Sequence, residues 1–205
     1  MKTYQIKEIF YSLQGEGAHT GRPAIFCRFS DCNLWNGKEE DRADAICKFC
    51  DTDFLGGKEY ELEKLVDVIS KQWPGGGTPY VICTGGEPLL QIDEALIDGL
   101  HRAGFEVGME TNGTVGKRDI AAKLDWVCVS PKADASLKLK RGNEIKLVFP
   151  QAENHPSDFE NLAFEHYYLQ PCDGVEGSMQ QAITYCMEHP RWKLSLQTHK
   201  IGGFE

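Results

Sequence analysis

The chain alternates short apolar runs with amphipathic stretches, and each apolar run ends in polar or glycine-rich residues. The clearest run is Tyr80-Val-Ile-Cys83, which leads directly into Thr84-Gly-Gly-Glu-Pro88. Short apolar runs bounded by turn residues are typical of buried strands. Six more runs of this kind cover residues 24–29, 105–109, 126–129, 144–149, 166–169 and 192–196.

Between these runs the apolar positions follow a helical period. Residues 59–73 place Leu62, Leu65, Val66, Ile69 and Trp73 on one face, which predicts an amphipathic helix. Two further helices are predicted with apolar residues at Ile92, Leu96, Ile97 and Leu100, and at Met179, Ile183 and Met187. Residues 117–123 are too weakly patterned for a full helix, and residues 4–11 predict a strand or extended arm.

Alternation of strands and helices predicts parallel βα units. The polar ends of the strands predict an active site at their C-terminal rim, as in α/β barrels. The strands are too few for a full eightfold barrel. The pattern therefore predicts an α/β fold, an incomplete (βα) barrel of parallel strands, and a single domain over residues 1–205.

Composition narrows the function classes. The 22 basic and 31 acidic residues give a net charge of −9, which argues against a nucleic-acid-binding surface. No apolar run approaches the length of a membrane span, and the N-terminus lacks the apolar core of a signal peptide. We therefore expect a cytoplasmic protein with no membrane partner. Eight cysteines in a reducing compartment indicate metal or catalytic thiols more than disulfides.

Three of the cysteines lie in one stretch, Cys32, Cys47 and Cys50, with spacing C-x14-C-x2-C. Three thiolates on an iron–sulfur cluster would leave one iron free for another ligand. Zinc is the alternative, with Cys83 or His19 completing the site, and the cysteines could also be small buried hydrophobic residues.

Other polar groups are candidates for ligand binding. Gly85 and Gly86 can expose backbone amides to a carboxylate, while Glu87 can accept a hydrogen bond from an ammonium group, although a tight turn explains the same motif. The glycine-rich stretch 12–18 is either a turn or a ligand loop. Arg28, the single charge in an apolar strand, needs a partner, either a structural carboxylate or a bound anion.

Taken together, these motifs resemble the radical S-adenosylmethionine superfamily. Nearly the whole chain resembles one family within it, the 7-carboxy-7-deazaguanine synthases of queuosine and deazapurine biosynthesis. The resemblance rests on residues 10–17, 26–29, 32–35, 47–52, 84–88, 110–113, 130–132 and 197–200. The departure is the spacing of the first two cysteines, which is usually three residues in the superfamily and here is fourteen.

The resemblance implies a radical ring contraction of 6-carboxy-5,6,7,8-tetrahydropterin to 7-carboxy-7-deazaguanine with loss of ammonia. It implies a [4Fe–4S] cluster on Cys32, Cys47 and Cys50, and Mg²⁺ on Thr52. The implied S-adenosylmethionine-binding residues are Phe49, Asp51, Gly86, Glu87, Ser130, Pro131, Lys132, Gln170, Pro171, Cys172 and Asp173. The implied pterin-binding residues are Leu13, Gln14, Gly15, Glu16, Arg28, Thr84, His199 and Glu205.

The family also implies a homodimer and a one-electron reductant such as flavodoxin. Two other functions fit parts of the pattern. One is a different radical S-adenosylmethionine enzyme, such as a glycyl-radical activase, and the other is a zinc-binding module without catalysis. Iron and sulfide in anaerobically purified protein would separate the enzymes from the zinc module.

Overall fold

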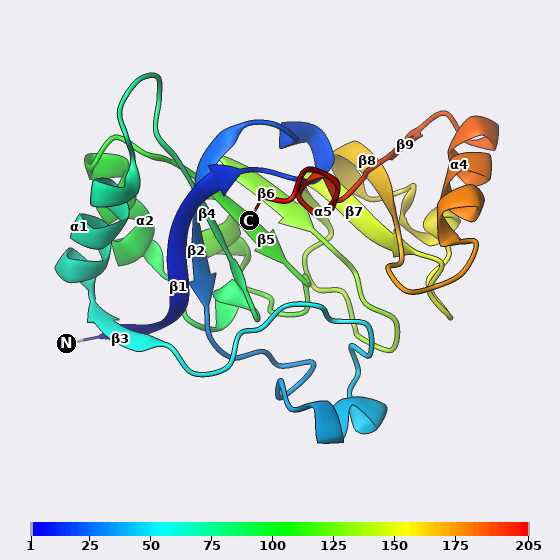
Figure 1. Cartoon of the computed structure of the whole chain (residues 1–205), viewed down its shortest axis with the longest axis horizontal. Helices are drawn as coiled ribbons and strands as arrows, with labels where there is room; N and C mark the ends of the chain where they lie inside the picture. The colour runs from blue at the N-terminus through cyan, green and yellow to red at the C-terminus, as the bar shows by residue number, and fades with distance from the viewer. Residues whose placement is uncertain (1, 205) are drawn as a thin grey trace.

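The computed structural model describes residues 2–204, and within this range one open sheet holds nine strands (Figure 1). Their order across the sheet is β3-β1-β2-β4-β5-β6-β7-β8-β9. The strands are β1 (Thr3–Leu13), β2 (Pro23–Phe29), β3 (Lys58–Glu61), β4 (Tyr80–Gly85), β5 (Glu106–Thr111), β6 (Trp126–Val129), β7 (Arg141–Phe149), β8 (Ala163–Pro171) and β9 (Trp192–Leu194).

Neighbouring strands from β2 to β9 pair in parallel. This confirms the predicted α/β fold with parallel strands. The strand β1 pairs antiparallel with both β2 and β3, so the sheet is mixed at one edge. Because the order ends at β3 on one side and β9 on the other, the barrel is incomplete, as predicted.

Four of the five helices in the described part of the chain connect successive strands, and the fifth follows the last strand. They are α1 (Leu62–Gln72), α2 (Glu94–Arg102), α3 (Arg118–Ala121), α4 (Ser178–Glu188) and α5 (Thr198–Gly202). Short 3₁₀ turns cover Gly17–His19, Glu39–Asp44, Pro88–Leu90 and Pro156–Phe159. Among residues 2–204, no helix is both long and apolar enough to span a bilayer.

Two details differ from the sequence prediction. The helix predicted over residues 59–73 begins only at Leu62, because residues 58–61 pair with β1 as the short edge strand β3. In α4 the buried residues are Ser178 and Ala182, whereas Met187 is 78% exposed. The weak pattern at 117–123 corresponds to the short helix α3.

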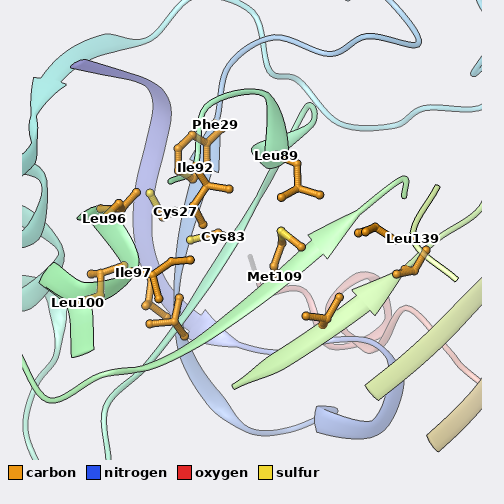
Figure 2. Packing of buried hydrophobic residues seen from close by; sticks show 14 of the residues in the cluster. Cys27, Phe29, Cys83, Leu89, Ile92, Leu96, Ile97, Leu100, Met109 and Leu139 are labelled. Carbon is orange, nitrogen blue, oxygen red and sulfur yellow. The ribbon is translucent and has the colours of Figure 1, made fainter. Parts of the chain in front are cut away.

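The main core lies between the sheet and the helices that cover one of its faces. Val81 and Cys83 of β4 belong to this core, together with Leu96 and Leu100 of α2 (Figure 2). Fully burying an aliphatic side chain of this size contributes about 1.5–3 kcal/mol. Asp93 caps α2 by accepting a hydrogen bond of 3.1 Å from the backbone N–H of Leu96. Packing and capping therefore anchor this helix against the strands.

The opposite face of the sheet is different, since side chains alternate along each strand. Phe26, Tyr80 and Ile82 form a small apolar cluster on it. Thr84 comes next on this face, at the C-terminal end of β4, and is buried and polar. The alternation therefore turns the polar ends of the strands away from the main core.

Residues 30–57 leave the sheet after β2 and return before β3 as a separate loop region (Figure 1). The backbone N–H groups of Ile46 and Cys47 both donate to the carbonyl of Leu34, at 3.1 and 3.3 Å. The Trp35 ring packs edge-on against Phe54, with centroids 5.6 Å apart. These contacts fold the long segment between the first two cysteines back on itself.

Candidate functional site

A cavity of about 460 Å³ opens where the parallel strands end. It is bounded by the loop of residues 30–57 and by α5, and its floor is formed by strand residues such as Thr84 and Lys146. The cavity is lined by most of the residues that the sequence predicted, namely Leu13, Gln14, Gly15, Glu16, Arg28, Cys32, Cys47, Phe49, Cys50, Asp51, Thr52, Thr84, Gly86, Ser130, Lys132, Gln170, Pro171, Cys172, Asp173 and His199.

Three predicted residues are not among this lining. Pro131 and Glu87 are described by the structure but do not line the cavity. Glu205 lies outside the described residues. The remaining predicted positions come from distant parts of the chain, and most of them lie in or directly after strands of the one sheet.

The three cysteines all line the cavity, and Cys47 interacts with both Cys50 and Cys32. Cys32 follows β2 directly, and the return of the loop at Leu34 brings Cys47 and Cys50 to the same wall. The Arg42 guanidinium holds this arrangement by donating to the Lys48 and Cys50 carbonyls, at 3.1 and 3.0 Å. The long spacing between the first two cysteines is thus accommodated by an ordered loop.

The thiols differ in their protonation. A hydrogen bond with Cys47 lowers the pKa of Cys50 to about 6, and the same bond together with burial raises the pKa of Cys47. Burial also raises the pKa of Cys32. Three thiols on one wall form a soft donor set that suits an iron–sulfur cluster.

No three Cys, His, Asp or Glu side chains within residues 2–204 converge closely enough to hold a single metal ion. A [4Fe–4S] cluster takes each thiolate on a different iron atom, so its ligands need not converge on one point. The two residues considered as a fourth zinc ligand lie elsewhere. Cys83 is in the main core, and His19 packs against Trp126 with ring centroids 4.0 Å apart.

The glycine-rich end of β4 fits closely against the start of the cysteine loop. A Cβ atom on Gly86 would clash with the carbonyl oxygen of Asp31, and one on Gly85, where φ is +120°, would clash with the backbone of Phe29. The Gly86 and Glu87 amides donate to the carbonyls of Phe29 and Asp31, at 3.1 and 2.8 Å. The Gly86 amide is therefore engaged within the protein, whereas the sequence predicted that it is free for a ligand.

Glu87 also differs from its predicted contact with an ammonium group. Its side chain is fully buried. The carboxylate accepts hydrogen bonds from the Leu89 amide, the Thr111 hydroxyl and the Asn112 amide, at 2.9, 2.7 and 2.8 Å. Burial raises the pKa of this group. Glu87 therefore links the loop after β4 to the end of β5 through hydrogen bonds, and so stabilises the wall of the cavity.

The floor of the cavity holds a buried ionic cluster that sequence reasoning missed. Lys146 of β7 is 5% exposed and forms ion pairs with Glu16 and, at 3.3 Å, with Glu110. Glu16 also accepts hydrogen bonds from the side-chain amides of Gln170 and Gln197, at 3.0 and 2.9 Å. Lys146 and Glu110 were not among the predicted site residues, although Lys146 is a lone cation in an apolar strand, the signal that singled out Arg28.

The predicted cations have defined partners. Arg28 donates to Glu8 at 2.6 Å while still lining the cavity, so a structural carboxylate is one of its partners. Lys132 donates to the backbone and hydroxyl oxygens of Ser130, at 2.8 and 2.6 Å. Its ammonium lies 5.8 Å from the centre of the Phe49 ring. Positive charge is thus placed on two sides of the cavity.

The short helix α5, near the C-terminus of the chain, contributes His199 and Lys200 to the cavity lining. The hydroxyl of Thr198 donates to the Gly15 carbonyl at 2.9 Å. Lys200 bridges Asp51 and Asp173, at 2.8 and 2.7 Å, and so joins the cysteine loop to the loop after β8. A Cβ on Gly15 would clash with the His199 ring, which explains the glycine at this contact.

Comparison with known proteins agrees with this geometry. Residues 42–142 match the family model described as the radical SAM superfamily; this range contains Cys47 and Cys50 but not Cys32. A 7-carboxy-7-deazaguanine synthase from Bradyrhizobium diazoefficiens is 56% identical, over 98% of this chain and 99% of its own. One from Burkholderia multivorans is 52% identical, over 97% of each chain.

A solved structure agrees as well. The crystal structure of QueE from Escherichia coli matches with a TM-score of 0.68 and 28% identity, covering 95% of this chain and 93% of that one. Sequence and fold therefore agree over nearly the full length. The chain belongs to the 7-carboxy-7-deazaguanine synthase family of the radical S-adenosylmethionine superfamily.

Proposed function

We propose that this chain converts 6-carboxy-5,6,7,8-tetrahydropterin to 7-carboxy-7-deazaguanine with loss of ammonia, as a step of queuosine biosynthesis. The observation that carries this proposal is one cavity in which three cysteines face a polar, ionic floor. Membership of the family at 56% identity supports it. We take the whole chain to act as a single domain.

Cys32, Cys47 and Cys50 would hold the [4Fe–4S] cluster. When bound, the cluster and S-adenosylmethionine supply one-electron chemistry and the radical that takes hydrogen from the substrate. The protein contributes a preformed arrangement of thiols. Arg42 holds the loop through two backbone carbonyls, and Cys47 is buried while Cys32 and Cys50 are half-buried.

The S-adenosylmethionine would lie between the cysteine wall and the ends of β6 and β8. Lys132 and Ser130 form a pre-oriented polar pair there, and Phe49 offers a ring face. Asp51 and Asp173 add carboxylates at the cavity mouth. The remaining proposed contacts are Gly86, Gln170, Pro171 and Cys172. The structure supports Glu87 as a brace for this wall rather than as a contact, since its carboxylate is satisfied internally.

The pterin would lie over the floor. Glu16 and Gln14 supply acceptors for N–H groups of the ring, Arg28 supplies a cation for the carboxylate, and Thr84 and His199 complete the polar lining. Leu13 and Gly15 would contact the ring face. Glu205 is kept as a proposed contact from the family resemblance alone.

Thr52 is proposed as a ligand of Mg²⁺, which prefers hard oxygen donors and usually shares few protein ligands with substrate and water. It lies two residues after Cys50 and lines the same cavity. Its position suits a metal ion that joins the substrate carboxylate to the protein beside the cluster.

Two partners are proposed from the family. An external one-electron reductant such as flavodoxin would reduce the cluster, and the chain would work as a homodimer. The α5 residue Lys200 lines the cavity and pairs with both Asp51 and Asp173, so α5 closes this side of the site. Exclusion of water protects reactive species from side reactions.

The test is conversion of the pterin by anaerobically reconstituted protein. We expect a deazaguanine carboxylic acid, ammonia, and many products per S-adenosylmethionine lost. Substrate deuterated at the abstracted position should transfer label to the recovered S-adenosylmethionine. Intact cluster without conversion would favour the glycyl-radical activase, and a colourless zinc protein would favour the non-catalytic module.

A further inference from the structure

The cation in the cavity floor is placed by the sheet itself. Ile145 and Leu147 of β7 are fully buried in the core on the helix side, so alternation turns Lys146 to the cavity side. A lysine is almost never buried unless its ammonium is paired. Here the ammonium meets Glu16 and Glu110.

The two carboxylates come from separate parts of the chain. Glu16 lies in the turn after β1, and Glu110 lies near the end of β5. The Glu16 side chain is held by residues far from it in the sequence, because its carboxylate contacts Lys146, Gln170 and Gln197. Glu16 therefore points to the floor because β7, β8 and the chain before α5 hold it there.

Glu110 is held in the same way. It accepts from the side-chain amide of Gln14 at 3.0 Å, from the Thr84 hydroxyl at 3.2 Å and from Lys146 at 3.3 Å. An ionised carboxylate has about four acceptor sites. Each of the two carboxylates therefore keeps acceptor capacity for a ligand above the floor.

We propose that Lys146 is the positioning residue of this site. Its ammonium holds Glu16 and Glu110 as a pair of ionised acceptors, so that together they bind the N–H edge of the ligand. This inference rests on the proposed function, because the pterin supplies that N–H edge. Lys146 acts through the two carboxylates and needs no contact with the ligand.

The electrostatics agree with this role. Burial opposes ionisation of Glu16, but the Lys146 ammonium and the Gln197 amide outweigh it and hold the pKa of Glu16 at about 2. The other titratable groups facing the two carboxylates are Tyr80 of β4, Cys128 of β6, Glu144 of β7 and His199 of α5. Of these, only His199 can add positive charge.

Without Lys146, two carboxylates would share a buried floor with little compensating charge. At least one of them would then take up a proton at neutral pH, because burial and like charge both raise a carboxyl pKa. Affinity for the N–H edge should fall near neutral pH and recover at higher pH as the carboxylates ionise.

The experiment measures binding of 6-carboxy-5,6,7,8-tetrahydropterin to anaerobically reconstituted protein between about pH 6 and pH 9. The variants are Lys146→Met, which removes the charge, and Lys146→Arg, which keeps it. The matched control is Lys193→Met, an exposed strand lysine of β9. Cluster content and S-adenosylmethionine binding are recorded for each.

We expect Lys146→Met to bind the pterin about tenfold more weakly near neutral pH, the ratio that about 1.4 kcal/mol produces. Its affinity should recover as the pH rises, while the wild type and Lys193→Met show no such recovery. Lys146→Arg should retain most of the affinity. Cluster content and S-adenosylmethionine binding should stay at wild-type levels throughout.

Removing one partner of a buried ionic cluster can prevent folding. For that case the double variant Lys146→Met/Glu110→Gln removes one positive and one negative charge, and should fold yet bind the pterin weakly. Wild-type affinity in either variant that carries Lys146→Met would overturn the proposed role of Lys146. It would leave the proposed function of the chain standing. A wild-type protein that does not bind the pterin would overturn the proposed function together with this inference.

Discussion

Replacing Gly86 with alanine tests how the end of β4 fits against the cysteine loop. The new Cβ would clash with the Asp31 carbonyl, and it would also lie 3.1 Å from the Cys32 backbone nitrogen. Both atoms belong to backbone that cannot rotate away as a side chain can. The chain must therefore shift at the residue that carries the first proposed cluster ligand.

The size of the effect follows from the packing. Forcing extra atoms into a well-packed site costs about 1–3 kcal/mol. For a protein of this length each kcal/mol lowers the melting temperature by about 2–4 °C, which gives a decrease of about 2–12 °C. Displacement of Cys32 should also reduce cluster occupancy, independently of the loss in stability.

The assay has two parts. Urea unfolding of the cluster-free protein reports the stability change, and anaerobic reconstitution followed by iron and sulfide analysis reports the cluster. The control is Gly116→Ala, whose Cβ would make only an ordinary contact of 3.7 Å with Lys138. If Gly86→Ala matched this control in both stability and cluster content, the close approach of β4 to the cysteine loop would be refuted.

The remaining predictions concern the cluster, the metal and pH. Cys32→Ala should abolish cluster assembly, whereas Cys186→Ala on α4 should keep it; a stable, active cluster in Cys32→Ala would show that the return loop does not deliver a ligand. Thr52→Ala should weaken pterin binding and lower turnover while cluster spectra stay unchanged, and activity indifferent to Mg²⁺ and chelator in both proteins would make Thr52 a structural residue. Because the pKa of Glu16 lies near 2 in the folded protein and near 4.5 in the unfolded chain, its stabilising contribution should be complete above about pH 4.5 and be lost as the pH falls toward 2. Urea unfolding of the wild type against Glu16→Gln should show this advantage shrinking on acidification, and an advantage constant with pH would contradict the ion pair with Lys146.

Local patterns determined much of this architecture. Apolar runs with polar ends predicted parallel strands and a site at their C-terminal rim, because a buried strand and the turn after it impose opposite requirements on side chains. The closely spaced Cys47 and Cys50 indicated a metal or cluster site, because both thiols belong to one short segment of the chain. The shortness of α3 was also predicted, because residues 117–123 are too weakly patterned for a full helix.

Contacts between distant segments could not be predicted in this way. Glu16 and Lys146 are 130 residues apart, and nothing in either neighbourhood specifies the other. Their pairing depends on the order of strands, which places β7 under the turn after β1. Lys146 was therefore overlooked, although a lone cation in an apolar strand requires a partner.

Tertiary structure also decided whether the polar groups of the Gly85–Glu87 segment are free to bind a ligand. Its sequence is compatible with free amides and an exposed carboxylate. The close approach of Asp31 and Phe29 engages the amides, and Thr111 and Asn112 engage Glu87. A sequence determines which hydrogen-bonding groups a turn carries, but the packing of neighbouring segments decides which of them remain free for a ligand, because buried polar groups must find partners wherever the fold provides them.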